Sequence, residues 1–342
     1  MSNTGLSAAT SKVDIDSVGA SFIAGNESDF AWTQLPRALC LDKRSGRSGV
    51  TNYELAKLEN FMLDGENLKN WEFGEALPAD KSLESDTVVI TCAGKTVPWG
   101  ISRPSNRPYP NRLEDLESNI VPGLLGTVMS GIEKDLATLM GNTDTWGAAK
   151  TWDTGTKLSA GDTTACLKEI MGHLTTLRKY SALPGMELWC ICDSRIPNLL
   201  AMYTDFSGGG SGSGLAASLT GTAAQNRIVE ALEIDRLVTM NSAINESKRG
   251  QTSAIDNTGN GVLWFGVVHN AGVVDLTSSD SFGKIDGAVA IGVSRMPEVV
   301  SDVDGLSEVE RFFGRCAYQV YSPRSAVGSD YLAIHYAAAT TV

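Results

Sequence analysis

The sequence predicts an α+β fold in which an N-terminal arm precedes a folded core. One long amphipathic helix occupies residues 112–140, and strand-like apolar runs lie on both sides of it. Residues 1–50, in contrast, carry little periodic apolar structure. With 342 residues, the chain is long enough for about two domains and a sizeable core.

The charge balance argues against a protein that grips nucleic acid tightly. The formal net charge at pH 7 is -12, whereas proteins that bind phosphate groups usually carry a basic surplus. An acidic surface instead keeps a crowded protein soluble before it assembles.

The cysteines and the first residues of the chain indicate the cellular compartment in which the protein is expected. Six cysteines are scattered along the chain, and we expect buried thiols in a reducing compartment. Cys190 and Cys192 share one face of a predicted strand but stand too far apart there for easy bridging. No apolar stretch approaches the ~20 residues of a membrane span, and the start MSNTGLSAATSK lacks the apolar core of a signal peptide. These features predict a protein that is made and kept in the cytoplasm.

Residues 1–50 are rich in Ser, Gly, Asp and Ala, with isolated apolar anchors such as Phe22 and Trp32. Such a segment cannot bury enough apolar surface to order itself, so we expect a neighbouring subunit to hold it. Its most basic stretch comprises Lys43, Arg44 and Arg47. Three charges are a thin footprint for nucleic acid, so contact with a carboxylate on a neighbour is favoured over contact with phosphate.

The next region predicts a short helix and an extended hairpin. Residues 51–62 place apolar side chains at helical spacing. Residues 86–93 and 96–101 read as two strands joined by a turn at Gly94 and Lys95. A lone two-stranded ribbon is only marginally stable in water, so it needs a partner surface. We expect deletion of residues 66–101 to leave a folded core that no longer assembles.

Residues 112–140 carry the strongest helical pattern, with apolar residues recurring at steps of three or four. The helix would be roughly 40 Å long, and Pro122 is expected to kink it or to mark a second start. The polar face, expected to meet solvent or a partner, comprises Glu114, Glu117, Ser130, Glu133 and Lys134.

The rest of the chain predicts a mixed region and closing strands. Helices are expected over 162–180 and 222–232, and strands over 186–192, 236–244, 262–269, 288–293, 312–321 and 331–338.

Residues that carry catalytic or metal chemistry are sparse. His173, His269 and His335 form no metal-binding pair, and each is expected to be a hydrogen-bonded structural residue. The glycine-rich stretch SGGGSGSG at 207–214 lacks the Gly-Lys-Ser/Thr ending of a phosphate loop and the spacing of a hydrolase elbow. The sequence therefore predicts no catalytic residue, no metal site and no cofactor.

Three stretches together resemble the major capsid proteins of tailed bacteriophages, of Hong Kong 97-like type. The hairpin and ISRPSNRPYPNR lead into the helix ending GIEKDLATLMGN, which is similar to the extended loop and spine helix of that family. The run LKEIMGHLTTLRKYSALPGMELWCICDSRIPNLLAMYTDF resembles the opening of its axial domain. The tail VERFFGRCAYQVYSPRSAVGSDYLAIHYAAA resembles its closing peripheral strands.

The resemblance implies a domain organisation. Residues 1–50 would form the N-terminal arm and 51–110 the extended loop. Residues 111–161 and 291–342 would form the peripheral domain, and 162–290 the axial domain.

The resemblance also implies a function. Copies of the chain would assemble in the host cytoplasm into hexamers and pentamers of an icosahedral shell, the virion capsid. Its partners would be other copies of itself, a portal protein, scaffolding and cement proteins, and packaged DNA held by confinement alone. The expected contacts between subunits, buried only on assembly, are Phe22, Trp32, Trp71, Phe73 and Trp99.

Three alternatives remain at this point. An encapsulin-like nanocompartment would share the fold but hold cargo enzymes. An α/β enzyme would need a convergent polar pocket. A tail or fibre protein would show fewer helices and more regular strands.

Overall fold

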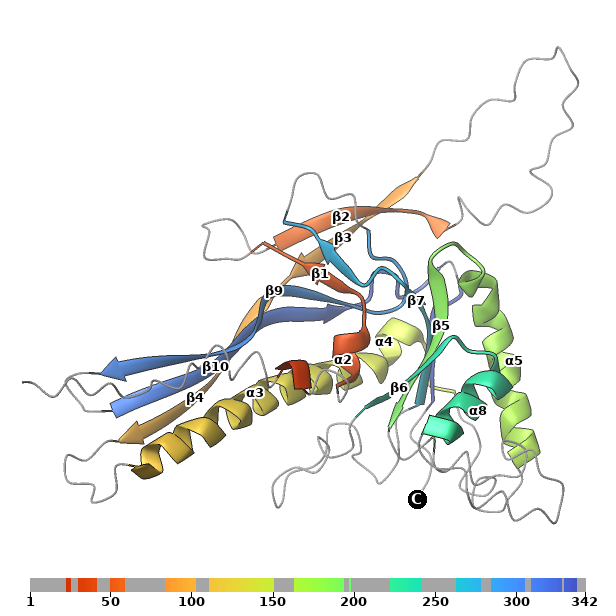
Figure 1. Ribbon diagram of the computed structural model, residues 1–342. Coiled ribbons are helices and arrows are strands. Elements are labelled where there is room, and N and C mark those ends of the chain that lie inside the picture. The colour runs from red at the N-terminus through yellow and green to blue at the C-terminus, as the bar shows by residue number, and fades with distance from the viewer. Residues whose placement is uncertain are drawn as a thin grey trace, which may run out of the picture.

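The computed structural model describes residues 23–25, 30–41, 50–58, 84–102, 111–150, 163–193, 197, 222–240, 263–277, 284–304, 309–327 and 329–336. These residues form two sheets, a two-stranded ribbon and several helices (Figure 1). No helix among them combines the length and the apolar character needed to cross a membrane.

The larger sheet has five strands in the order β4-β10-β9-β1-β8. Its strands are β1 (Arg37–Leu39), β4 (Ala93–Ser102), β8 (Val273–Asp275), β9 (Ala290–Asp304) and β10 (Val309–Tyr321). The helix α3 (Asn111–Met140) runs along β4, β9 and β10 (Figure 1). The alternation along β10 explains this packing, because its even-numbered residues from Phe312 to Tyr318 are buried while the odd-numbered residues between them are half exposed. Gly314 lets the helix approach closely, since a Cβ there would meet Leu124 and Val128.

The long helix confirms the prediction from periodicity. Its apolar residues pack inward in the expected rows, including Leu124, Val128, Ile132 and Leu136. The helix is continuous through Pro122, so a second helix start at this point is wrong.

The smaller sheet has four strands in the order β11-β7-β5-β6. Its strands are β5 (Met186–Asp193), β6 (Arg236–Met240), β7 (Leu263–His269) and β11 (Ala333–Tyr336), and all four were expected. The helices α4 (Thr143–Trp146), α5 (Thr163–Ser181) and α8 (Thr222–Leu232) accompany it. Residues 263–268 of β7 are all buried, which explains their continuous apolar run.

A ribbon of two antiparallel strands, β2 (Val50–Ala56) and β3 (Ser85–Thr91), projects above the larger sheet (Figure 1). The predicted helix over 51–62 is therefore wrong for residues 51–56. Thr51 and Leu55 are buried while Asn52 and Glu54 are exposed, which is the alternation of a half-buried strand.

The predicted pairing of the hairpin is also wrong. Residues 85–91 pair with β2, and residues 93–102 pair with β10, so the two runs do not pair with each other. Gly94 and Lys95 lie within β4 rather than in a turn. At Cys92 the chain passes from the ribbon into the larger sheet.

Part of the predicted N-terminal arm is folded into its own subunit. The short helix α2 (Ala31–Gln34) packs against α3 and β6. Strand β1 lies between β8 and β9 and pairs with both in parallel. The expectation that a neighbour must order the segment is therefore wrong for residues 30–39. Two-sided pairing supplies the ordering that local apolar content lacks.

Candidate assembly surfaces

The helix α2 is fastened to α3 by a buried carboxylate. The backbone amides of Ala31 and Trp32 donate to Glu133 Oε1 and Oε2 at 2.9 and 3.1 Å. Glu133 is 0% exposed, and burial raises its pKa to about 7 although both hydrogen bonds act to lower it. The expectation that Glu133 faces solvent or a partner is therefore wrong.

The same contact corrects the expectation for Trp32. Its side chain is 1% exposed within a single subunit, so it does not become buried only on assembly. Its own helix α3 and the core supply the covering surface that was expected from a neighbour.

One face of the ribbon packs against its own subunit, and the opposite face is exposed in the single subunit. Val88 and Ile90 pack inward in a cluster with Cys40 and Tyr321. On the opposite face, Val89 is 54% exposed, and Val50 at the end of the partner strand is 43% exposed. The register places Val89 opposite Asn52 and Val50 opposite Thr91, so the two valines lie diagonally on one outer face.

The larger sheet presents a second half-covered face, opposite α3. Pro98, Phe313 and Val300 form a cross-strand row on this face, and all three remain partly or fully exposed. Beside them, Arg315 Nε donates to Glu298 Oε1 at 2.6 Å. An apolar row rimmed by an ion pair is typical of a surface that another protein covers.

Trp99 lies on the edge strand β4 in register with Phe312, and so on the face of the sheet that packs against α3. Its ring centroid is 6.4 Å from that of Phe312, and its side chain is 39% exposed. Trp99 therefore stays a predicted subunit contact.

One arginine joins the base of the ribbon to the segment that leads into β9. Arg324 is 8% exposed, and its Nε and Nη2 donate to the two carboxylate oxygens of Asp286 at 2.6 and 3.1 Å. Nη2 also donates to the carbonyl oxygen of Ala56, the last residue of β2. The peptide after Asp286 is held against β7, because Ala288 N donates to Val267 O at 2.7 Å.

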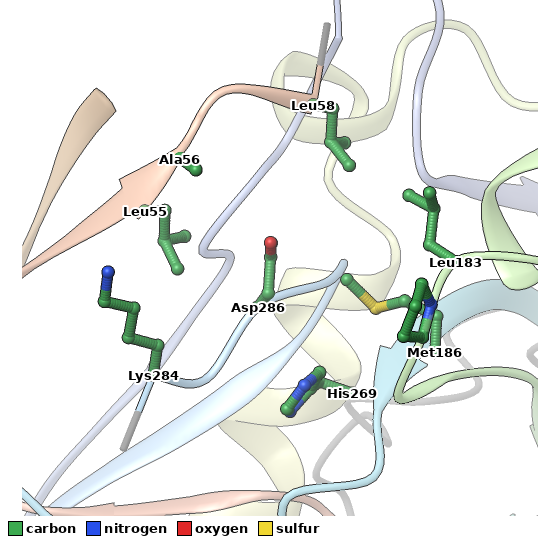
Figure 2. A pocket seen from close by; sticks show the side chains of 9 residues that line it. Leu55, Ala56, Leu58, Leu183, Met186, His269, Lys284 and Asp286 are labelled. Atoms are coloured by element: carbon green, nitrogen blue, oxygen red, sulfur yellow. The ribbon is translucent and has the colours of Figure 1, made fainter. Parts of the chain in front are cut away.

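A cavity of about 360 Å³ lies beside this junction (Figure 2). Its described lining is mainly apolar, with polar groups from His269, Lys284 and Asp286. Of these polar groups, the carboxylate of Asp286 is paired with Arg324.

The histidines were expected to be hydrogen-bonded structural residues, and His173 has such a contact. His173 Nδ1 lies 2.9 Å from the Tyr336 hydroxyl. His335 is buried, and neither of its ring nitrogens has a hydrogen-bond partner in the described part of the chain. The expectation of a hydrogen-bonded His335 is wrong, and burial lowers its pKa because the charged ring is poorly solvated. Within the described residues, no group of three or more His, Cys, Asp or Glu could hold a metal ion.

Six of the predicted contact residues lie outside the described ranges, namely Phe22, Lys43, Arg44, Arg47, Trp71 and Phe73. Sequence reasoning missed Arg324, Val50 and Val89. A signal existed for the valines, because Thr87, Val89 and Thr91 alternate with inward residues. Arg324 gave no local signal, since its partner Asp286 lies 38 residues away.

Comparisons with known proteins bear on the fold. No protein-family model matches the chain, and no curated protein matches its sequence. A phage-related protein from Bordetella bronchiseptica RB50 matches in structure with a TM-score of 0.53 at 10% identity, over 94% of this chain and 96% of that one.

Two further solved structures match with lower scores. The mature capsid of bacteriophage PhiM1 matches with a TM-score of 0.49 at 12% identity, over 89% of this chain and 85% of that one. A virus-like particle from Pyrococcus furiosus matches with a TM-score of 0.49 at 8% identity, over 94% and 99%. The chain therefore shares its fold with a phage-related protein, in keeping with the predicted resemblance to tailed-phage major capsid proteins.

Proposed function

We propose that this chain is the major capsid protein of a tailed phage, whose copies form a closed shell around DNA. The observation that carries the proposal is the ribbon, which is anchored by one face and exposes Val50 and Val89 on the other. A two-stranded ribbon with an exposed apolar face is stabilised when a second surface covers it.

The surface that suits the ribbon is the open face of the larger sheet in a neighbouring copy. The row formed by Pro98, Phe313 and Val300 is apolar, as are the two exposed valines of the ribbon. Ribbon and sheet face are different patches, so the contact is heterologous and closes into rings when the rotation between copies allows. A stable contact of this kind should bury more than about 2,000 Å² per subunit in total.

Other parts of the proposal rest on the resemblance. Hexamers and pentamers would tile an icosahedral shell in the virion, assembled in the host cytoplasm. Residues 1–50 would serve as the arm and 51–110 as the extended loop, with 111–161 and 291–342 peripheral and 162–290 axial. Portal, scaffolding and cement proteins are the proposed partners. DNA would be confined rather than gripped, in keeping with the net charge of -12.

Cysteine cross-linking tests the contact. In the double variant Val89→Cys and Phe313→Cys, oxidation should give covalent ladders of several subunits. Either single variant is the matched control and should give at most dimers. A double variant that assembles normally but forms no ladder beyond dimers contradicts the ribbon-to-sheet contact.

Gene neighbours separate this function from the encapsulin-like alternative. Genes for a portal, a terminase and a protease beside this gene support a phage capsid. A neighbouring gene for a cargo enzyme, with none of these three, contradicts it.

A further inference from the structure

The carboxyl group of Glu133 is buried where it contacts the segment before β1, and few hydrogen-bond donors are available there to compensate for a negative charge. The carboxylate lies in the apolar core, and among the described residues it accepts hydrogen bonds only from the backbone amides of Ala31 and Trp32. An ionised carboxylate removed from water is costly unless a cation or several donors compensate for it. A protonated carboxyl incurs a much smaller cost in the same place.

No charged side chain of the described residues is seen to compensate for Glu133. The helix α2 has the sequence AWTQ and carries no charge. On α3, Lys134 is exposed and Asp135 binds Lys95 instead. On the strands packed against α3, the titratable groups Cys316 and Tyr318 lie near Asp135. On β6, which packs against α2, Arg236 pairs with Glu187.

We propose that Glu133 is a protonation-controlled clasp, which holds residues 30–35 on α3 more firmly when its carboxyl group carries a proton. Ionisation would favour the open form, in which water reaches the carboxylate. This inference goes beyond the proposed function and does not depend on shell formation.

The opening would be confined to the segment before β1. Residues 37–39 are paired with β9 on one side and β8 on the other, and Ile291 N donates to Pro36 O at 3.0 Å. Residues 30–35 have no such ladder and depend on the buried apolar side chains of Phe30, Trp32 and Leu35 together with the Glu133 contact. Release would therefore free the chain up to about Pro36 and leave β1 in the sheet.

The sign of the pH effect follows from the raised pKa. With the clasp closed, the pKa of Glu133 is about 7, against an ordinary value of 4.5. Docking is therefore favoured below pH 4.5 and is progressively lost as the pH rises through about 7. Each unit of pKa difference is a tenfold change in the ratio of closed to open forms, so the ratio should fall on the order of tenfold to a hundredfold between pH 5 and pH 8.

Hydrogen exchange of the full-length protein tests the clasp. Protection factors, which correct for the intrinsic pH dependence of exchange, are measured for peptides covering residues 30–35 and 263–269 between pH 5 and pH 8. Protection of 30–35 should fall tenfold or more as the pH rises, while protection of the buried strand 263–269 should fall much less. Equal behaviour of the two peptides in the wild-type protein overturns the proposal, whether or not any variant folds.

Two variants sharpen the test. In Glu133→Gln, which cannot ionise, protection of residues 30–35 should stay constant across the pH range. Glu230→Gln removes an exposed carboxylate from α8 and should follow the wild type. A Glu133→Gln protein that keeps the wild-type pH dependence overturns the proposal.

Discussion

Arg324 and Asp286 form a paired, two-hydrogen-bond contact in which the guanidinium Nε and Nη2 meet opposite carboxylate oxygens at 2.6 and 3.1 Å. Both side chains are largely buried. Because Arg324 also donates to Ala56 O, one side chain links β2 of the ribbon to Asp286, in the segment that leads into β9. We infer that this contact fixes the angle at which the ribbon leaves the subunit.

Replacing Arg324 by Met should be strongly destabilising. The change leaves the carboxylate of Asp286 buried without its partner, which typically costs about 3–5 kcal/mol of unfolding free energy. Urea denaturation of the unassembled subunit measures the loss. Lys57→Met is the control, because Lys57 pairs with Glu84 where both are well exposed, and its effect should stay below about 1 kcal/mol. Equal losses of unfolding free energy in the two variants would show that the Arg324 contact stabilises the subunit no more than an exposed ion pair does.

Two glycines of different geometry should respond in opposite directions to alanine. Gly287 has φ +103°, and a Cβ there would lie 2.8 Å from Val267 O. Gly287→Ala should lower the unfolding free energy by about 1–3 kcal/mol. Gly123 lies inside α3 with open space around it, so Gly123→Ala should raise stability by about 0.5–1 kcal/mol. Urea denaturation of both variants measures the two changes in unfolding free energy. A Gly287→Ala protein more stable than the wild type would contradict the positive φ and the close contact with Val267 O at this position.

His335 should make the subunit sensitive to mild acid. Burial lowers its pKa below the ordinary 6.5, so the folded state resists protonation while the unfolded chain accepts it. Stability from this group is present above pH 6.5 and should fall by up to about 1.4 kcal/mol per pH unit below it. The difference in unfolding free energy between wild type and His335→Gln, measured at pH 7.5 and 5.5, isolates the effect from Glu133, which acts in the opposite direction. If the difference in unfolding free energy between the two proteins is the same at both pH values, His335 does not cause the acid sensitivity.

The outer face of the ribbon should matter for assembly and not for folding. Val89→Asp places a charge on an exposed position, so subunit stability should change by less than about 1 kcal/mol. Shell formation should be lost, because a buried unpaired charge would lie in the contact. Val273→Asp is the matched control, since Val273 is equally exposed, at 55%, but lies on β8 away from the ribbon's outer face. Normal shells from Val89→Asp would contradict the role of this face.

The structure contradicts the expectation that deleting residues 66–101 leaves a folded core. Removing residues 66–101 would take away β3, most of β4 and the buried Ile90, so the five-stranded sheet would lose its edge. A better variant replaces 59–83 by a short Gly-Ser linker, because Lys57 N already donates to Glu84 O at 2.8 Å across the gap. This variant should fold as a subunit and fail to form normal shells, as judged by denaturation and light scattering. Normal shells would show that residues 59–83 are dispensable for assembly.

Periodicity predicted the elements whose burial is regular. The helix α3 and the strands β5, β7 and β10 follow from repeating apolar positions, because one face or both faces of each are covered. Strand β2 was missed because Leu55 and Leu58 happen to suit helical spacing, while the deciding alternation comes from Thr51 and Leu55.

The residues that join distant segments were not predictable in the same way. Glu133 is four residues from both Met129 and Ala137, so its place on the buried face could have been read from the helix. Its partners, the amides of residues 31 and 32, lie about a hundred residues earlier and leave no pattern. Arg324 is unpredictable for the same reason, since long-range pairing is set by the assembled fold.

Electron microscopy of the purified full-length protein tests whether this chain builds a shell. We expect closed, roughly spherical particles of uniform diameter, formed by the protein alone or with a scaffolding protein encoded beside it. Val89→Asp examined in parallel should give no such particles. A wild-type protein that stays monomeric under both conditions, or that forms only open fibres, would contradict the claim that this chain builds a shell.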